Sequence, residues 1–309
     1  MMRRYPEWLK RPFSPDGVAR EVQSLVSDLR LTTVCESALC PNLRECWSQR
    51  QLTFMILGET CTRRCRFCAV PHGHPTAVEE DEPRRVAEAA HRLGLSHIVI
   101  TSVARDDLRD EGAAYFIEVV EAVRHRNPGI TVELLVPDFH AREELIRRVL
   151  QEARPEVFAH NVETIERLSA LLRPQADYRR SLQVLRCAAS LNTGCLIKSS
   201  VMVGLGETED EMLHTFDEVL AAGATRLTIG QYVRPDARHL PVMEYVSPQR
   251  FAAYERLAYR RGFVWVTSGP FVRSSYHAID ALQPVSSSEF RVSSLTNAKL
   301  ETQNAKLAA

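Results

Sequence analysis

Short apolar runs alternate with segments of helical period along most of the chain. Six compact runs have the length and composition of β-strands, at 52–57, 97–101, 130–136, 156–160, 195–203 and 226–231. Each is followed by a helical pattern, at 82–93, 113–126, 141–152, 162–191, 208–221 and 248–261. We expect the fourth helical segment to break near Arg173 and Pro174, and a strand-like piece at 263–267 follows the last helix.

The six runs are apolar throughout rather than alternating, which is typical of strands buried on both faces. Repeated strand–helix units therefore predict an α/β fold, a partial (βα)6 parallel TIM-like barrel. We expect four regions: an extension at 1–50, the barrel at 51–262, a C-terminal segment at 263–285 and a flexible tail at 286–309. In such a barrel the working residues lie in the loops after the strands, so these loops should carry the chemistry.

Composition narrows the class of protein. The chain has 309 residues, 45% of them hydrophobic, and its 39 Lys and Arg balance 39 Asp and Glu. Zero net charge argues against a protein that binds nucleic acid or an anionic membrane. No apolar run approaches the roughly 20 residues of a membrane helix. The first residues carry arginines without an apolar run behind them, so we predict no secretory or transit peptide and a cytoplasmic location.

Six of the eight cysteines lie between positions 35 and 68, which favours metal or redox chemistry over disulfides in a chain without a secretion signal. Cys61, Cys65 and Cys68 have C-x3-C-x2-C spacing in the loop after the first strand. A structural zinc ion or a fully liganded iron–sulfur cluster takes four protein ligands, so three thiolates leave one metal vertex open for a substrate. A zinc site completed by His72 or His74 is the alternative.

A second triplet, Cys35, Cys40 and Cys46, has C-x4-C-x5-C spacing and precedes the first strand. Beside another cluster motif, a second iron–sulfur centre explains it more economically than scattered or disulfide-paired cysteines. Its fourth ligand must come from elsewhere in the chain. Cys187 and Cys195 lie far downstream, and we expect them to be buried, inert thiols.

The loop of Cys61, Cys65 and Cys68 resembles the cluster-binding loop of radical S-adenosylmethionine (SAM) enzymes, with Phe67 at the position of the family's usual aromatic residue. The resemblance implies a [4Fe–4S] cluster whose open iron chelates SAM and whose electron cleaves it to a 5′-deoxyadenosyl radical. Both triplets, with the segments TSVARDDL, AHNVETIERL, VGLGET and GPFVRSSYHA, resemble the lipoyl synthase family over residues 7–278.

This narrower resemblance implies that Ser275, the second serine of RSSY, closes an auxiliary [4Fe–4S] cluster that supplies sulfur. The implied reaction inserts two sulfur atoms, at C6 and C8, into an octanoyl group on a lysine of a lipoyl carrier domain, of the dehydrogenase E2 or glycine-cleavage H protein type. The implied partners are a flavodoxin- or ferredoxin-type electron donor and an iron–sulfur cluster delivery protein. Without the resemblance, Ser274 and Ser275 would be ordinary loop hydroxyls. A biotin synthase-like enzyme and a zinc-stapled binding module remain the alternatives.

Polar residues at or just past the strand ends are candidates for the ribose, amino and carboxylate groups of SAM. Gly204 and Gly206 follow a strand, but Glu209 stands where a dinucleotide motif has its third glycine. The segment instead resembles the superfamily's G-x-I-x-G-x-x-E stretch beside the adenine, with departures at Ser200 and Met202. The candidates, each with a capping or turn role as alternative, are Thr101, Ser102, Asn161, Glu163, Lys198, Gly204 and Glu207.

One position departs from the family pattern. Ala104 stands in SVARDDL where many lipoyl synthases have an aspartate. Any contact made by that carboxylate is therefore lost or replaced in this chain.

Overall fold

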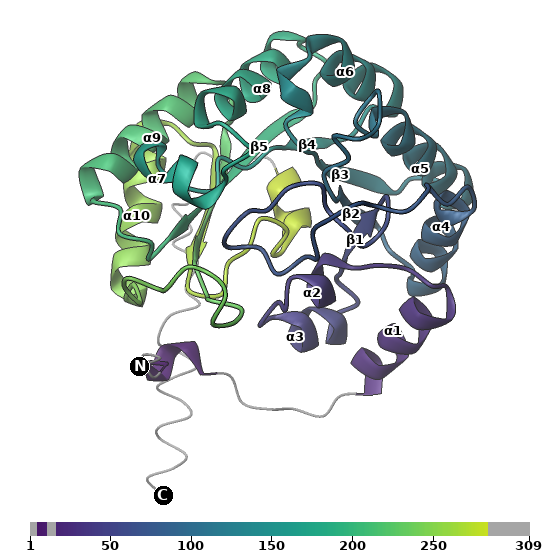
Figure 1. Cartoon of the computed structure of the whole chain (residues 1–309), viewed down its shortest axis with the longest axis horizontal. Helices are drawn as coiled ribbons and strands as arrows, with labels where there is room; N and C mark the ends of the chain where they lie inside the picture. Colours follow the sequence, from purple (N-terminus) through teal and green to yellow (C-terminus); the bar gives the residue numbers. More distant parts are fainter. Residues whose placement is uncertain (1–4, 11–16, 284–309) are drawn as a thin grey trace, which may run out of the picture.

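Seven parallel strands form one curved sheet in the computed structural model, which describes residues 5–10 and 17–283. The strands pair in chain order: β1 (Thr53–Ile56), β2 (His97–Ser102), β3 (Thr131–Leu135), β4 (Val157–Ala159), β5 (Leu196–Val203), β6 (Arg226–Gln231) and β7 (Trp265–Gly269). Helices cover the outside of the curve (Figure 1). The predicted α/β partial barrel of six strand–helix units is confirmed, and the strand-like piece near 263–267 adds a seventh strand, β7, which pairs with β6.

The outer helices follow the predicted pattern closely. They are α4 (Glu82–Leu93), α5 (Ala113–Arg126), α6 (Glu143–Arg148), α7 (Glu166–Leu172), α8 (Tyr178–Ser190), α9 (Glu209–Ala221) and α10 (Pro248–Arg261). The expected break near Arg173 separates α7 from α8, and Thr208 with Glu211 forms a capping box at the start of α9. The single helix predicted at 141–152 is wrong: α6 ends at Arg148 and a π-helical turn, η3 (Val149–Ala153), follows. The tail predicted at 286–309 lies outside the described residues.

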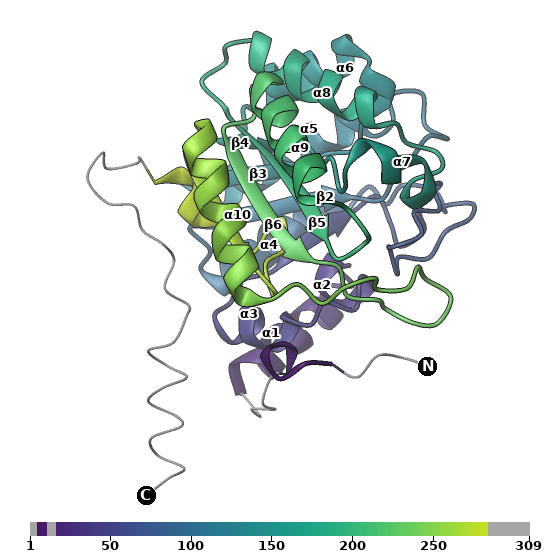
Figure 2. The same cartoon turned by 90° about the vertical axis from the view of Figure 1, so that its left-hand side faces the viewer.

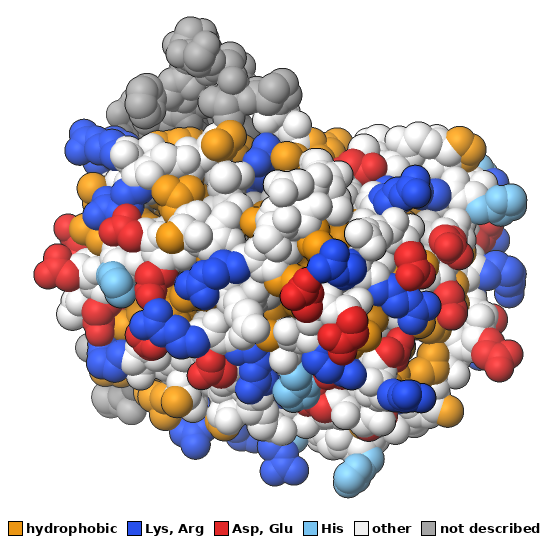
Figure 3. Space-filling model, turned by 90° about the horizontal axis from the view of Figure 1, so that it is seen from above, with side chains coloured by type: hydrophobic (Ala, Val, Ile, Leu, Met, Phe, Trp, Pro, Cys, Tyr) orange, Lys and Arg blue, Asp and Glu red, His pale blue; other side chains and the backbone are white. Residues whose placement is uncertain are grey.

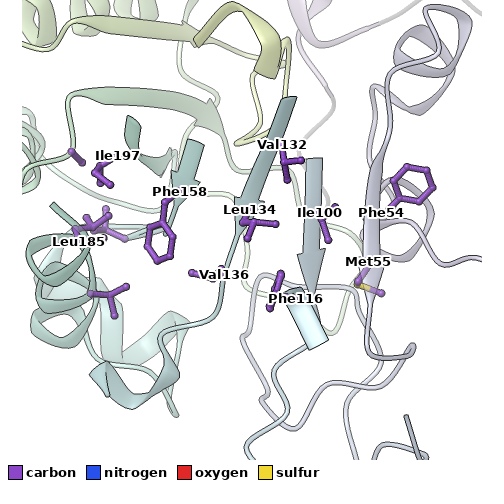
Figure 4. Close-up of a cluster of buried hydrophobic side chains, with 14 of the residues drawn as sticks. Phe54, Met55, Ile100, Phe116, Val132, Leu134, Val136, Phe158, Leu185 and Ile197 are labelled. Atoms are coloured by element: carbon purple, nitrogen blue, oxygen red, sulfur yellow. The ribbon is translucent and has the colours of Figure 1, made fainter. Parts of the chain in front are cut away.

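The main core lies between the outer face of the sheet and these helices. Phe54, Ile100 and Leu134 come from neighbouring strands and are fully buried. Figure 4 shows them in one cluster with Phe116 of α5 and Leu185 of α8. Because the sheet has its outer face buried in this way, side chains of the opposite parity point into the barrel and form the walls of its interior.

Before β1, the described residues form a short 3-10 helix, η1 (Glu7–Leu9), and the α-helices α1 (Gly17–Asp28), α2 (Val34–Ser37) and α3 (Leu43–Ser48). The three α-helices lie together on one side of the barrel (Figure 2). The segment after β7 ends in a 3-10 helix, η4 (Ala278–Leu282), inside the curve of the sheet (Figure 1). Asn42 donates a hydrogen bond to the carbonyl of Phe271, and Tyr276 donates one to Glu45 at 3.2 Å. The region of α3 and the segment after β7 are therefore in direct contact.

The outer surface mixes charges of both signs. Figure 3 views the molecule from the top of Figure 1 and shows Lys and Arg interspersed with Asp and Glu. On α6, Arg147 pairs with Glu143, and Arg148 pairs with Glu152 just beyond the helix. None of the helices within the described residues is long and apolar enough to cross a membrane.

Candidate active site

A cavity of about 850 Å³ occupies the interior of the partial barrel. This volume lies within the range of small-molecule sites. Both cysteine triplets contribute to its wall, and so does the RSSY segment from the other end of the chain. The wall therefore combines residues from before β1, from the strand ends and from beyond β7: Cys35, Cys40, Cys46, Cys61, Cys65, Cys68, Ser274 and Ser275.

The loop of Cys61, Cys65 and Cys68 is held by its own backbone and by its neighbours. The amide of Cys61 donates to the carbonyl of Pro71 at 2.8 Å, and that of Cys68 donates to Cys65 at 3.1 Å. The sulfur of Cys61 accepts from the backbone amides of Arg63 and Ala104, at 3.4 and 3.3 Å. Amide donors of this kind stabilise negative charge on a sulfur.

The alanine at position 104 does not remove the hydrogen bond to the Cys61 sulfur. The bond to Cys61 comes from the backbone amide of Ala104, and an alanine supplies that amide as well as an aspartate would.

The chemistry of these three thiols suits an iron–sulfur cluster. Burial raises the pKa of Cys65 to about 12 and that of Cys68 to about 11, so without a metal both remain protonated at neutral pH. Metal binding requires thiolates, and three soft sulfur donors suit an iron–sulfur cluster. His72 and His74 are exposed, which weakens the zinc alternative.

Cys35, Cys40 and Cys46 lie on and between the short helices α2 and α3. Cys35 is 8% exposed, and burial raises the pKa of its thiol to about 11, although the nearby backbone of Thr53 lowers it in part. The hydroxyl of Thr53 donates to the oxygen of Ser275 at 2.8 Å. Thr53 thus lies beside a member of the triplet and contacts the serine that the family resemblance implies as fourth ligand.

Four of the predicted SAM contacts line the cavity: Thr101, Ser102, Asn161 and Glu163. The hydroxyl of Thr101 donates to the carbonyl of Leu135 at 2.8 Å, and the amide of Asn161 donates to Glu163 at 3.0 Å. Burial raises the pKa of Glu163. Within the described chain, Ser102 Oγ and Asn161 Oδ1 are buried without a hydrogen-bond partner. Leaving such atoms unpaired is costly, so these residues fit a polar ligand.

The other three predicted SAM contacts have structural positions away from the cavity wall. The Lys198 ammonium lies 2.8 and 2.9 Å from the carboxylate oxygens of Glu133, and each of these side chains is 1% exposed. Glu207 accepts from the backbone amides of Gly204 and Leu205 at 2.6 and 2.9 Å. Gly204 has a φ of +95°, and a Cβ there would lie 2.1 Å from Gln231 Nε2. Each of these three residues therefore has a structural contact, and a role in SAM binding stays a prediction.

Two arginines that the sequence did not single out lie in the site. Arg63, between the first two cysteines of its loop, binds Asp106 at 2.7 Å and Asp138 at 2.8 Å. Burial opposes ionisation of Asp138, but the hydrogen bonds from Arg63 outweigh it and lower the Asp138 pKa. These ion pairs fix the loop to the ends of β2 and β3.

Arg173, which the sequence marked only as a helix break, lines the cavity and is 4% exposed. Its positive charge lowers the pKa of Cys65 against the larger effect of burial, and the charge of Glu163 partly offsets the lowering of the Arg173 pKa by burial. A buried guanidinium beside the cluster loop suits a carboxylate ligand.

Comparison with known proteins defines the class of the site. Residues 55–219 match the model of the Radical SAM superfamily. Methylornithine synthase shares the fold with a TM-score of 0.54 at 12% identity, over 96% of this chain and 93% of that one. HydG, a maturase of the [FeFe]-hydrogenase, gives 0.53 at 14% identity, over 87% and 74%. The chain is a radical SAM enzyme, and this class uses SAM and a [4Fe–4S] cluster.

Closer relatives give the family within that class. Lipoyl synthase of Caldanaerobacter subterraneus subsp. tengcongensis is 51% identical over 89% of this chain and 96% of that protein. Lipoyl synthase of Thermus thermophilus is 48% identical over 89% and 86%. The chain therefore belongs to the lipoyl synthase family and is a sulfur-inserting enzyme.

Proposed function

We propose that this chain inserts two sulfur atoms, at C6 and C8, into an octanoyl group on a lysine of a lipoyl carrier domain, and that a second [4Fe–4S] cluster supplies the sulfur. Cys35, Cys40, Cys46 and Ser275 would hold that auxiliary cluster. The observation that carries the proposal is that both triplets lie on the wall of one cavity. SAM cleavage needs only the loop of Cys61, so the second triplet is available for another task.

The geometry of β1 supports a substrate held between the two triplets. Thr53, at the start of β1, contacts the auxiliary residues, and the loop of the other triplet follows the end of the strand. At about 3.3 Å per residue, Thr53 and Leu57 are separated by roughly 13 Å. A chain lying along β1 could present one carbon to both sites in turn.

The wall between the triplets suits an aliphatic chain. Met55, Val99, Leu135 and Met202 line it from four different strands. Carbons C6 and C8 are unactivated, and no acid or base of ordinary strength removes their hydrogens. A radical is therefore required, and apolar side chains along the wall also limit the access of water to a reactive intermediate.

The residues of the site have distinct tasks toward SAM. Cys61, Cys65 and Cys68 would hold the cluster that, when bound, supplies the electron for reductive cleavage of SAM. Arg173 supplies a cation for the SAM carboxylate. Asn161 and Glu163 supply acceptors for its amino group or ribose hydroxyls.

Partners of three kinds complete the proposed reaction. The carrier domain is of the dehydrogenase E2 or glycine-cleavage H protein type. A flavodoxin- or ferredoxin-type donor supplies electrons, because each SAM cleavage consumes one. An iron–sulfur cluster delivery protein rebuilds the auxiliary cluster, because sulfur donation dismantles it. These partners are expectations from the family resemblance, and the cytoplasmic location is an expectation from the first residues of the sequence.

The test is an anaerobic incubation of the reconstituted protein with SAM, a reductant and an octanoylated carrier peptide. Mass spectrometry should detect the dithiolane on the octanoyl-lysine, and the same peptide without the octanoyl group should remain unchanged. A parallel incubation with dethiobiotin tests the biotin synthase-like alternative. Sulfur insertion into dethiobiotin, or SAM cleavage without any thiolated peptide, would contradict the proposal.

A further inference from the structure

Thr53 is the one contact that the structure shows for the side-chain oxygen of Ser275 among the described residues. Its hydroxyl donates to Ser275 Oγ at 2.8 Å, and the two residues are 222 positions apart in sequence. Thr53 is 3% exposed, and its side chain points into the barrel from the start of β1. The backbone of the same residue lies near the thiol of Cys35 and lowers its pKa in part, against the larger effect of burial. One residue therefore lies beside both ends of the proposed auxiliary site.

Other contacts hold the backbone of the segment that carries Ser275. Asn42 donates to the carbonyl of Phe271, Tyr276 donates to Glu45, and Arg226 donates to the carbonyl of Ala281 at 2.7 Å. These anchors lie on both sides of Ser275 in sequence. Removing the Thr53 hydroxyl therefore leaves the segment attached and changes only the surroundings of the serine oxygen.

We infer that Thr53 is a positioning residue for Ser275: its hydroxyl holds the serine oxygen toward Cys35, both while that oxygen ligates the auxiliary cluster and after it is released. This inference rests on the proposed function, because it assumes that Ser275 is a cluster ligand. A serine oxygen has enough lone pairs to accept the Thr53 hydrogen bond and to bind iron at the same time. The hydrogen bond also restricts the rotation of the Ser275 side chain, which reduces the entropy lost on ligation.

A matched pair of substitutions isolates the hydroxyl. Thr53→Val keeps the β-branched shape that suits a buried strand and removes the donor, whereas Thr53→Ser keeps the donor. Thr228→Val is the control, because Thr228 is also a buried strand threonine, and its hydroxyl has no partner within the described chain. All three are made in a full-length parent in which alanine replaces Cys61, Cys65 and Cys68, so that only the auxiliary site can load.

Each protein is reconstituted anaerobically, its iron and sulfide are counted, and the loss of cluster absorbance in excess chelator is timed. A hydrogen bond of typical strength corresponds to about a fivefold change in rate, so Thr53→Val should lose its cluster about fivefold faster than the parent. Thr53→Ser and Thr228→Val should stay within about twofold of it. Adding Thr53→Val to Ser275→Ala should cause no further acceleration, because the oxygen that Thr53 contacts is then missing. A merely structural role of Thr53 would still accelerate the loss in that background.

The outcomes separate the two claims. The inference is overturned, and the proposed function stays intact, if the parent holds about four irons and Thr53→Val loses its cluster no faster than the parent. The inference is also overturned if Thr53→Val accelerates cluster loss equally with and without the Ser275 oxygen. A parent that holds no cluster overturns the auxiliary site itself, and the inference with it.

Discussion

Replacing Lys198 by methionine should destabilise the fold by about 3–4 kcal/mol at pH 7, because it leaves Glu133 buried without a partner. Both side chains are 1% exposed, and the ammonium lies 2.8 Å from the nearer carboxylate oxygen. Burial raises the pKa of Glu133, so the stranded carboxyl takes up a proton rather than remain charged. Holding a glutamate of ordinary pKa in its protonated form at pH 7 costs about 3.7 kcal/mol, at 1.36 kcal/mol per pH unit.

The same reasoning gives a pH dependence. In the Lys198→Met variant the folded protein binds a proton at Glu133 that the unfolded chain releases above its ordinary pKa. Stability relative to the wild type therefore improves as the pH falls, by about 1.4 kcal/mol per unit down to about pH 4.5. The double variant Lys198→Met with Glu133→Gln removes the charge altogether and should recover most of the loss.

Urea unfolding at pH 7 and pH 5.5 measures the free energy of unfolding of the wild type, the two single variants and the double variant. SAM binding is measured on the folded fraction, and it should persist in Lys198→Met because Lys198 does not line the cavity. The reasoning is refuted if Lys198→Met is as stable as the wild type, or if the double variant is as unstable as the sum of the single ones. A stable variant that has lost SAM binding would instead assign Lys198 to the cofactor.

Three further predictions concern the clusters and the barrel. Cys65→Ala should abolish reductive cleavage of SAM, whereas Cys40→Ala should leave cleavage intact and remove sulfur insertion; equal effects in a 5′-deoxyadenosine assay would contradict this division. Ser275→Cys should keep its iron but slow the dismantling of the auxiliary cluster, because a thiolate is the softer iron ligand. The amounts of mono- and dithiolated product in a single turnover measure the sulfur transfer. Sulfur transfer as in the wild type would refute the prediction. Burial lowers the pKa of His97 to about 4, so protonation of His97 destabilises the wild type as the pH falls from about 6.5 toward 4. Urea unfolding of His97→Gln should therefore show a smaller loss of the free energy of unfolding over this range, by up to about 3 kcal/mol. An equal pH dependence of stability in the variant and the wild type would contradict this prediction.

The sequence predicts the barrel well because its signals are local. Apolar strands and helical periods recur in alternation, and β7 was counted apart only because it follows the last complete unit. The π-helical turn at Val149–Ala153 was missed, since its apolar spacing does not differ visibly from that of a continuing helix. Boundaries such as those of α4 and α5 follow from the hydrophobic pattern and agree with it.

The candidate site also has features that the local sequence shows and features that depend on the fold. Each cysteine triplet is a local motif, so its spacing is visible in the chain. The ion pair of Lys198 could not be predicted, because a strand position does not reveal the charge that faces it, and Glu133 reaches Lys198 only through the pairing of β3, β4 and β5. The bond between Thr53 and Ser275 likewise joins distant segments, and only the folded chain brings them together.

The count of iron and sulfide in anaerobically purified protein tests the central claim most directly. Two [4Fe–4S] clusters require about eight irons and as much sulfide per chain, and replacing Cys35, Cys40 and Cys46 by alanine should reduce both to about four. Four irons in the wild type, or zinc without sulfide, would contradict a sulfur-donating second cluster beside the radical site.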